Sequence, residues 1–257
     1  MPALTLVMEW QVGLWIDAMA AVGMALLLER WRPAWDADRR PATPLAASPF
    51  RAVGIVWRQP SLRMMAFAGA GIVAAQICMQ SYTVPMFYEQ FALTLVEAGW
   101  ILTVSQLGGT FGRPFWGWLA DRRRDCLTVL ALLACTLALA TLCVGTLPWG
   151  WPRPLVYVLF FVFGATASGW NGAFLGEVAR AAPPGLVSTA TGGSLFFVNV
   201  ASITAPIVFA NIYAATTNYS LTFALLTATS AASIGCLLRA RQYQRLSAST
   251  QNAGRSN

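Results

Sequence analysis

The sequence predicts an all-α membrane protein, a multi-pass helical bundle with about seven transmembrane helices. Hydrophobic residues make up 57% of its 257 positions and charged residues only 11%, whereas a soluble globular chain is about 25% charged. The hydrophobic residues gather in runs close to the length of about 20 residues that crosses a bilayer. These runs are continuous rather than alternating, which indicates helices and not barrel strands.

Seven such runs follow one another along the chain. The first, at 12–28, contains one acid, Asp17, and is followed by a polar, proline-bearing loop. Within that loop, residues 50–62 have apolar side chains near helical spacing, which is typical either of an amphipathic helix on the membrane face or of an irregular loop. The remaining spans are predicted at 64–87, 98–119, 126–147, 155–175, 186–213 and 221–238.

These spans divide the chain into four expected parts. They are a single transmembrane helix at 1–29, a cytoplasmic linker loop at 30–63, a six-helix bundle at 64–240 and a flexible cytoplasmic tail at 241–257.

The distribution of arginine predicts the orientation in the membrane. All 17 basic side chains are arginines, and arginine concentrates in cytoplasmic loops. When alternate loops are counted, only Arg153 falls on the side opposite to all the others. We therefore expect an odd number of spans, with the N-terminus outside and the C-terminus in the cytoplasm. The arginine-only, alanine-rich composition further favours a bacterial protein in the inner (plasma) membrane.

The composition also argues against several classes of function. Histidine, the commonest general base and metal ligand, does not occur in the sequence. The five cysteines lie in or beside apolar runs and form no CxxC pair, so we interpret them as small apolar residues. No catalytic cluster is visible, and we expect neither an enzyme nor a cofactor or metal site. Because the arginines lie between apolar runs, the expected partner is the lipid bilayer and not nucleic acid.

The most charged run of the chain, "GRPFWGWLADRRRD", lies between the third and fourth predicted spans. It resembles the loop motif of the major facilitator superfamily of secondary transporters. Gly117, Asp121 and Arg122 match that motif, and Arg113 fits its usual context, whereas the run departs from the motif at Arg124 and at the aspartate after it. The resemblance implies a conformational latch between helix bundles. Simple anchoring of the loop in the cytoplasm is the alternative, and it explains the arginines but neither Gly117 nor Asp121.

A second stretch strengthens this resemblance. "LGEVARAAPPGLVSTATGGSLFFVNVASITAPIVFANI" is similar to the segment that joins the tenth and eleventh helices of the superfamily. In that register residues 10–240 correspond to the sixth to twelfth helices. The resemblance implies half of the transporter fold, the C-terminal half, truncated at its N-terminus and preceded by one orphan helix.

The function that the resemblance implies is transmembrane transport of a small molecule. The chain would be a truncated or split form of the transporter, which needs a partner to be active. That partner would be a missing N-terminal half or a second copy of the chain. The alternative is a non-transporting membrane scaffold or regulator derived from half of a transporter.

Polar side chains inside the spans are the candidates for a substrate site, because they are costly to place in lipid, and transporters of this fold bind substrate near the bilayer midplane, between two halves. The alternative is that they hydrogen-bond to neighbouring helices, for about 0.6 kcal/mol each. By chemistry alone, Asp17 and Glu89 are weak candidates for proton coupling. The substrate candidates are Gln76, Gln80, Tyr82, Gln106, Trp170, Asn171 and Asn199.

Small residues recur at every fourth position of the fifth predicted span. They are Gly164, Ser168, Gly172 and Gly176, and this spacing predicts close packing against another helix.

Overall fold

The computed structural model describes residues 10–35, 49–123, 125–147 and 151–253. Every regular element in these ranges is a helix, which confirms the predicted all-α class. The chain divides into two units, Met1–Ser48 and Pro49–Asn257, and each is taken by itself below.

The described part of the first unit is one helix, α2, Trp10–Trp35. It covers the predicted first span and extends it by about two turns at its C-terminal end. Between residues 14 and 32 its apolar side chains are exposed, and so is Asp17. The helix is long and apolar enough to cross a membrane by itself.

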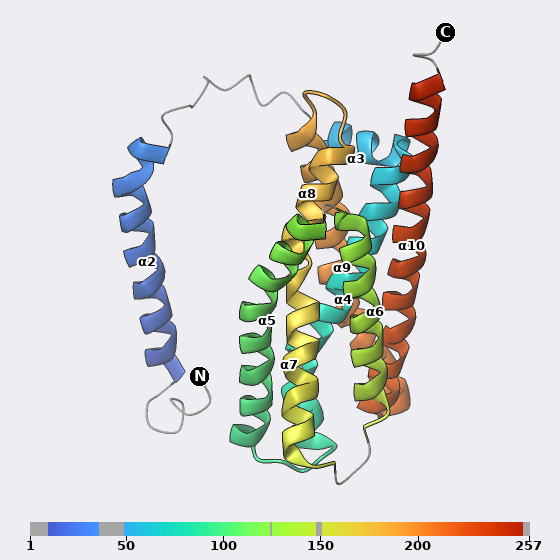
Figure 1. Cartoon of the computed structure of the whole chain (residues 1–257). Coiled ribbons are helices and arrows are strands. Elements are labelled where there is room, and N and C mark those ends of the chain that lie inside the picture. Colours follow the sequence, from blue (N-terminus) through green and yellow to red (C-terminus); the bar gives the residue numbers. More distant parts are fainter. Residues whose placement is uncertain (1–9, 36–48, 124, 148–150, 254–257) are drawn as a thin grey trace. The chain divides into compact units, whose positions relative to one another are not determined.

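The second unit is a bundle of helices whose long axes run roughly along one direction, so that the chain passes back and forth between its two ends (Figure 1). Its elements are α3 (Pro49–Arg58), α4 (Pro60–Glu89), α5 (Leu95–Arg123), α6 (Cys126–Gly145), α7 (Arg153–Gly169), α8 (Asn171–Ala181), α9 (Val187–Thr216) and α10 (Tyr219–Ala253).

The helix α4 is the centre of this bundle. It packs against α5, α9 and α10, while α5 also lies along α7, and α6 lies between α7 and α10. The core consists of aliphatic and aromatic side chains from all of these helices, with Phe160, Phe163, Phe174 and Phe223 among the largest buried members. The bundle is therefore a packed unit in its own right.

Six helical stretches of the described chain are long and apolar enough to cross a membrane, one fewer than the seven predicted spans. The difference lies in α5, which has the length of a span, with 29 residues, but is more polar than the others. Its polar side chains include Gln106, Thr110 and Arg113, which are exposed on the bundle surface.

The predicted helix at 155–175 is in fact two helices. α7 ends at Gly169 and α8 begins at Asn171, so Trp170 forms a short turn between them. A side chain added at Gly169 would meet the ring of Trp116, which shows how closely α5 approaches the backbone at this junction. α8 then continues to Ala181, six residues beyond the end of the predicted span at 175.

The last helix is longer than its apolar run. α10 continues to Ala253, through most of the residues expected to form a tail. Tertiary contacts account for the first part of this extension, since Arg241 and Gln244 each bond to side chains of neighbouring segments. Hydrophobic patterning cannot reveal such contacts.

Of the two interpretations of residues 50–62, the helix is the one that the structure shows. Along α3, Val56 is fully buried, whereas Arg51 and Arg58 are exposed, so the helix is amphipathic. It packs on α9, where Gly193 lies directly against the backbone of Ala52.

Charge is distributed unequally between the two ends of the bundle. The helix α3, the helix α8 and the C-terminal end of α10 lie at one end (Figure 1), and they carry Arg58, Arg180 and Arg241. At the opposite end Arg153 forms an ion pair with Glu97, at a distance of 2.9 Å from nitrogen to oxygen. This arrangement agrees with the arginine asymmetry read from the sequence.

Candidate functional site

A buried polar contact lies inside the bundle, between α4 and the junction of α7 and α8. The indole Nε1 of Trp170 donates a hydrogen bond of 2.9 Å to Oε1 of Gln76. Trp170 is only 2% exposed and Gln76 only 9%. The structure thus brings together two of the predicted site residues, and it gives both of them a packing partner.

The position of Trp170 depends on the close approach of α5 and α7. Gly164 lies against the backbone of Ser105, and the indole of Trp116 donates a hydrogen bond of 3.1 Å to the carbonyl of Ala165. Glycine and serine permit this approach because they place almost no volume between the two helices. The predicted packing ridge is confirmed at Gly164.

The other positions of that ridge behave differently. Ser168 lies against Gly109, as predicted, but Gly172 and Gly176 have no atom close to the place that a side chain would occupy. The break at Trp170 is the reason, because it separates these two glycines from the helix that packs on α5.

Tyr82 joins α4 to α9. Its ring stacks on Phe209 with the centroids 4.3 Å apart, and its hydroxyl donates a hydrogen bond of 2.8 Å to the carbonyl of Pro206.

The four remaining substrate candidates are amides on four different helices. Gln80 on α4 and Asn171 on α8 are half-buried, whereas Gln106 on α5 and Asn199 on α9 are exposed. None of these four side chains has a hydrogen-bond partner among the described residues. In a hydrocarbon environment such amides would be costly, so the surfaces that carry them fit a polar cavity or a protein partner better than lipid.

The two acidic candidates occupy different surroundings. Asp17 is exposed on α2. Glu89, at the end of α4, accepts hydrogen bonds from the hydroxyls of Tyr213 and Tyr219, at 3.0 and 2.9 Å. Glu89 therefore ties together the ends of α4, α9 and α10.

The predicted latch lies on a helix and not in a loop, because α5 continues to Arg123. Gly117 has open space beside it, so it mediates no close approach to another described helix. Asp121 and Arg113 are exposed, and Arg122 lies over the ring of Trp118, 5.5 Å from its centroid.

The sequence analysis missed Asp125, which makes more contacts than any of the predicted latch residues. Its carboxylate accepts hydrogen bonds from the backbone and the hydroxyl of Thr128, and so caps the N-terminus of α6. It also forms an ion pair of 3.0 Å with Arg241 on α10. The capping role could have been read from the sequence, because an aspartate directly before an apolar run is a helix-start signal.

Burial of Asp125 would by itself raise its pKa. The hydrogen bonds from Thr128 and the charges of Arg241 and Arg245 outweigh burial, and they hold the pKa of Asp125 below its usual range. The carboxylate is therefore a stable anion at the end of the bundle.

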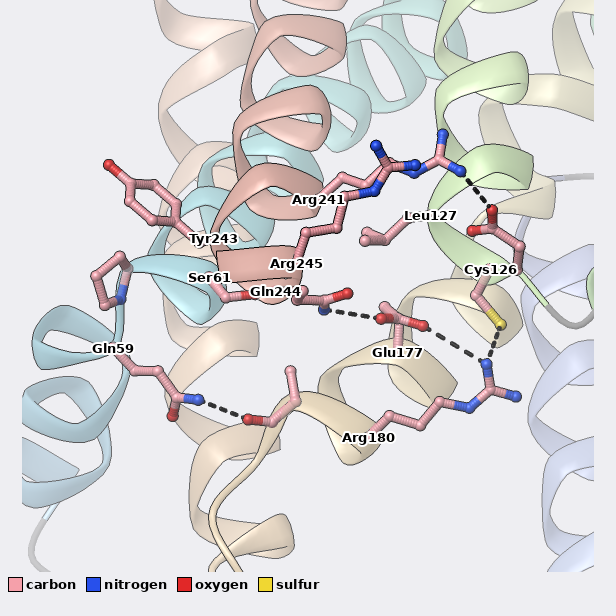
Figure 2. Close-up of a pocket in the computed structure, with 13 residues that line it drawn as sticks. Gln59, Ser61, Cys126, Leu127, Glu177, Arg180, Arg241, Tyr243, Gln244 and Arg245 are labelled. Carbon is pink, nitrogen blue, oxygen red and sulfur yellow. Dashed lines mark hydrogen bonds and ion pairs between the residues drawn. The ribbon is translucent and has the colours of Figure 1, made fainter. Parts of the chain in front are cut away.

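Asp125 is part of the wall of a cavity of about 740 Å³, which we call the charged pocket (Figure 2). Inside it, Gln244 donates a hydrogen bond of 2.9 Å to the buried Glu177, and Arg180 lies 3.7 Å from the same carboxylate. The pocket is lined by Gln59, Pro60, Ser61, Asp125, Cys126, Leu127, Glu177, Arg180, Ala181, Arg241, Tyr243, Gln244 and Arg245.

A bundle of long apolar helices, crossed by a few buried polar contacts and charged at its ends, defines a multi-pass membrane protein. The family model of the Major Facilitator Superfamily matches residues 1–206 and, in a second alignment, residues 79–254. The chain therefore belongs to the major facilitator superfamily, whose members are transporters. No curated protein matches the sequence.

Proposed function

We propose that this chain takes part in the transport of a small polar molecule across a membrane, as an MFS-type secondary transporter. The observation that carries the proposal is the set of four amides on α4, α5, α8 and α9 that have no partner among the described residues. Amides both donate and accept hydrogen bonds, so they suit a neutral polar substrate. Family membership supports the general class of function.

The proposed substrate site combines these amides with the buried contact behind them. Gln80, Gln106, Asn171 and Asn199 would contact the substrate. The pair formed by Gln76 and Trp170, together with Tyr82, would hold α4 and α9 in the geometry that presents those amides. Transporters of this kind bind between two bundles, so we propose that a second bundle closes the site, whichever chain provides it.

The latch and coupling roles belong to the same proposal. Arg113, Asp121 and Arg122 are exposed, so they are available to contact a second bundle that approaches α5. Glu89 and Asp17 are the acids proposed for proton coupling. The proposed location is the inner (plasma) membrane of a bacterium, with the N-terminus outside and the C-terminus in the cytoplasm.

A ligand screen followed by uptake would test the substrate site. The chain, purified in mild detergent, would be screened for compounds that raise its unfolding temperature, and hits would be tested for uptake into vesicles of cells that express it. Asn199→Leu should remove both stabilisation and uptake. The matched control is Thr204→Val on the same helix, because the Thr204 hydroxyl already bonds to the carbonyl of Val200. Equal loss in both variants, or unchanged binding in Asn199→Leu, would refute the assignment.

A further inference from the structure

The charged pocket lies at one end of the bundle, where α4 and α6 begin and α8 ends, and the proposed substrate site does not use it. Its side chains enter from α4, α8 and α10 and from the segment that opens α6, as Figure 2 shows. Segments this distant in sequence form one cavity only in the folded bundle.

The first turn of α4 brings an unsatisfied donor, the hydroxyl of Ser61, to the pocket. Gln59 precedes the helix but provides no side-chain cap, because its amide donates instead to the carbonyl of Ala181, at 2.7 Å. The N-terminus of a helix carries a partial positive charge and free N–H groups. Ser61, in this first turn, is only 7% exposed, and its hydroxyl has no hydrogen-bond partner. This hydroxyl therefore has a donor that no described side chain or backbone group uses.

The charges of the pocket also favour an anion. Three guanidinium groups face two carboxylates, which leaves one positive charge in excess. Arg241 is paired with Asp125, and Arg180 is near Glu177. Arg245 contributes to the positive charge near Asp125 but forms no ion pair or hydrogen bond with the described residues, so its N–H donors are available to a ligand.

We propose that the charged pocket binds a phosphate group. Arg245 and the hydroxyl of Ser61 would donate to its oxygens, with the backbone N–H groups of Ser61 and Leu62, in the first turn of α4, behind them. Helix N-termini and arginine forks are the groups that proteins commonly use for phosphate. The cavity is larger than one phosphate, so the group would belong to a larger molecule, either a soluble phosphorylated compound or the headgroup of a phospholipid.

The test uses the full 257-residue chain purified in detergent. Inorganic phosphate would be titrated by calorimetry, and retention of phosphatidylglycerol would be measured by native mass spectrometry. Arg245→Gln and Ser61→Val should each weaken binding about tenfold, the factor expected when one hydrogen bond to a charged group is lost. The matched control is Arg239→Gln, an exposed arginine on α10 outside the pocket, which should leave binding unchanged.

The two probes distinguish the sources of the phosphate group. Binding of phosphate alone supports a soluble ligand, and binding of phosphatidylglycerol alone supports a lipid headgroup. Circular dichroism would confirm that each variant remains folded. The proposal is refuted if neither probe binds, if both pocket variants bind like the wild type, or if Arg239→Gln weakens binding as much as Arg245→Gln. None of these outcomes depends on whether the chain transports a substrate.

Discussion

The hydrogen bond from Trp170 to Gln76 joins two residues that lie 94 positions apart in the sequence and are both buried in the bundle. It connects the middle of α4 to the turn between α7 and α8. Because both side chains are buried, loss of one partner leaves the polar group of the other unsatisfied.

Replacement of Trp170 by phenylalanine should therefore destabilise the bundle. The substitution removes the donor and leaves Oε1 of Gln76 buried, which should lower the free energy of unfolding by about 1–3 kcal/mol. Unfolding by sodium dodecyl sulfate in mixed micelles would measure this change. Trp100→Phe, at an exposed position of α5, is the control and should have little effect.

Two glycines should respond in opposite ways to a larger side chain. Gly164→Val should strongly destabilise the bundle, because Gly164 lies against the backbone of Ser105. Gly117→Ala should be neutral or should stabilise α5, by up to about 1 kcal/mol, because open space surrounds it and alanine favours helix. The same unfolding assay would compare them. A loss of stability in Gly117→Ala would mean that this position has a structural contact that the described residues do not provide.

Sequence patterning predicted the helices because a membrane span is a continuous run of about 20 mostly apolar residues, which is visible in the composition alone. The prediction was least secure for α5, because Gln106 and Arg113 interrupt its apolar run. The break at Trp170 was not predictable, because it occurs where the ring of Trp116 on α5 lies close to the backbone of Gly169, and this contact exists only in the folded bundle. The extension of α10 was missed for a similar reason, since it is accompanied by the bonds of Arg241 and Gln244 to distant segments.

The candidate site was less accessible to prediction than the fold. Amides inside spans can be recognised from sequence, but their partners cannot, and only the structure separates Gln76, which is bonded, from Gln106, which is exposed. The charged pocket is formed by residues as far apart in the sequence as 59 and 245. These residues come together only when α4, α6, α8 and α10 pack against one another. Asp125 could have been found as a helix cap, although its pairing with Arg241 could not.

Acid should remove the contribution that the charge of Asp125 makes to stability. The pKa of Asp125 in the folded state is below its ordinary value of 3.8, so this contribution is complete above that value and is lost as pH falls through the folded-state pKa. Asp125→Asn should keep the cap, since asparagine caps well, but lose the charge. The difference in unfolding free energy between wild type and variant should be constant above about pH 5 and should shrink below about pH 4. A difference that grows on acidification would contradict this role.

The arginine asymmetry predicts where the two ends of the bundle lie. A reporter fused after Asn257 should be active only in the cytoplasm, and one inserted at Gly150 should be active only outside, because arginine-rich loops stay in the cytoplasm. Phosphatase and green fluorescent protein fusions, which require opposite sides, would report both positions. Activity of the phosphatase at Asn257 would invert the proposed orientation.

The final prediction concerns the chain by itself. Alternating access requires two bundles that rock about a site between them, and the described residues from α4 to α10 form one. Amides such as Gln106 and Asn199, left without partners, would then face lipid, which favours association with a second bundle. The 257-residue chain, purified in mild detergent, should therefore run as an oligomer or bind another bundle. Reconstituted as a verified monomer, it should move none of the compounds that stabilise it.

Size-exclusion chromatography with light scattering would establish the oligomeric state, and uptake into proteoliposomes would establish transport. Robust uptake by the monomer would refute the two-bundle requirement for this chain, whereas uptake only by an oligomer would support a second copy as the missing partner.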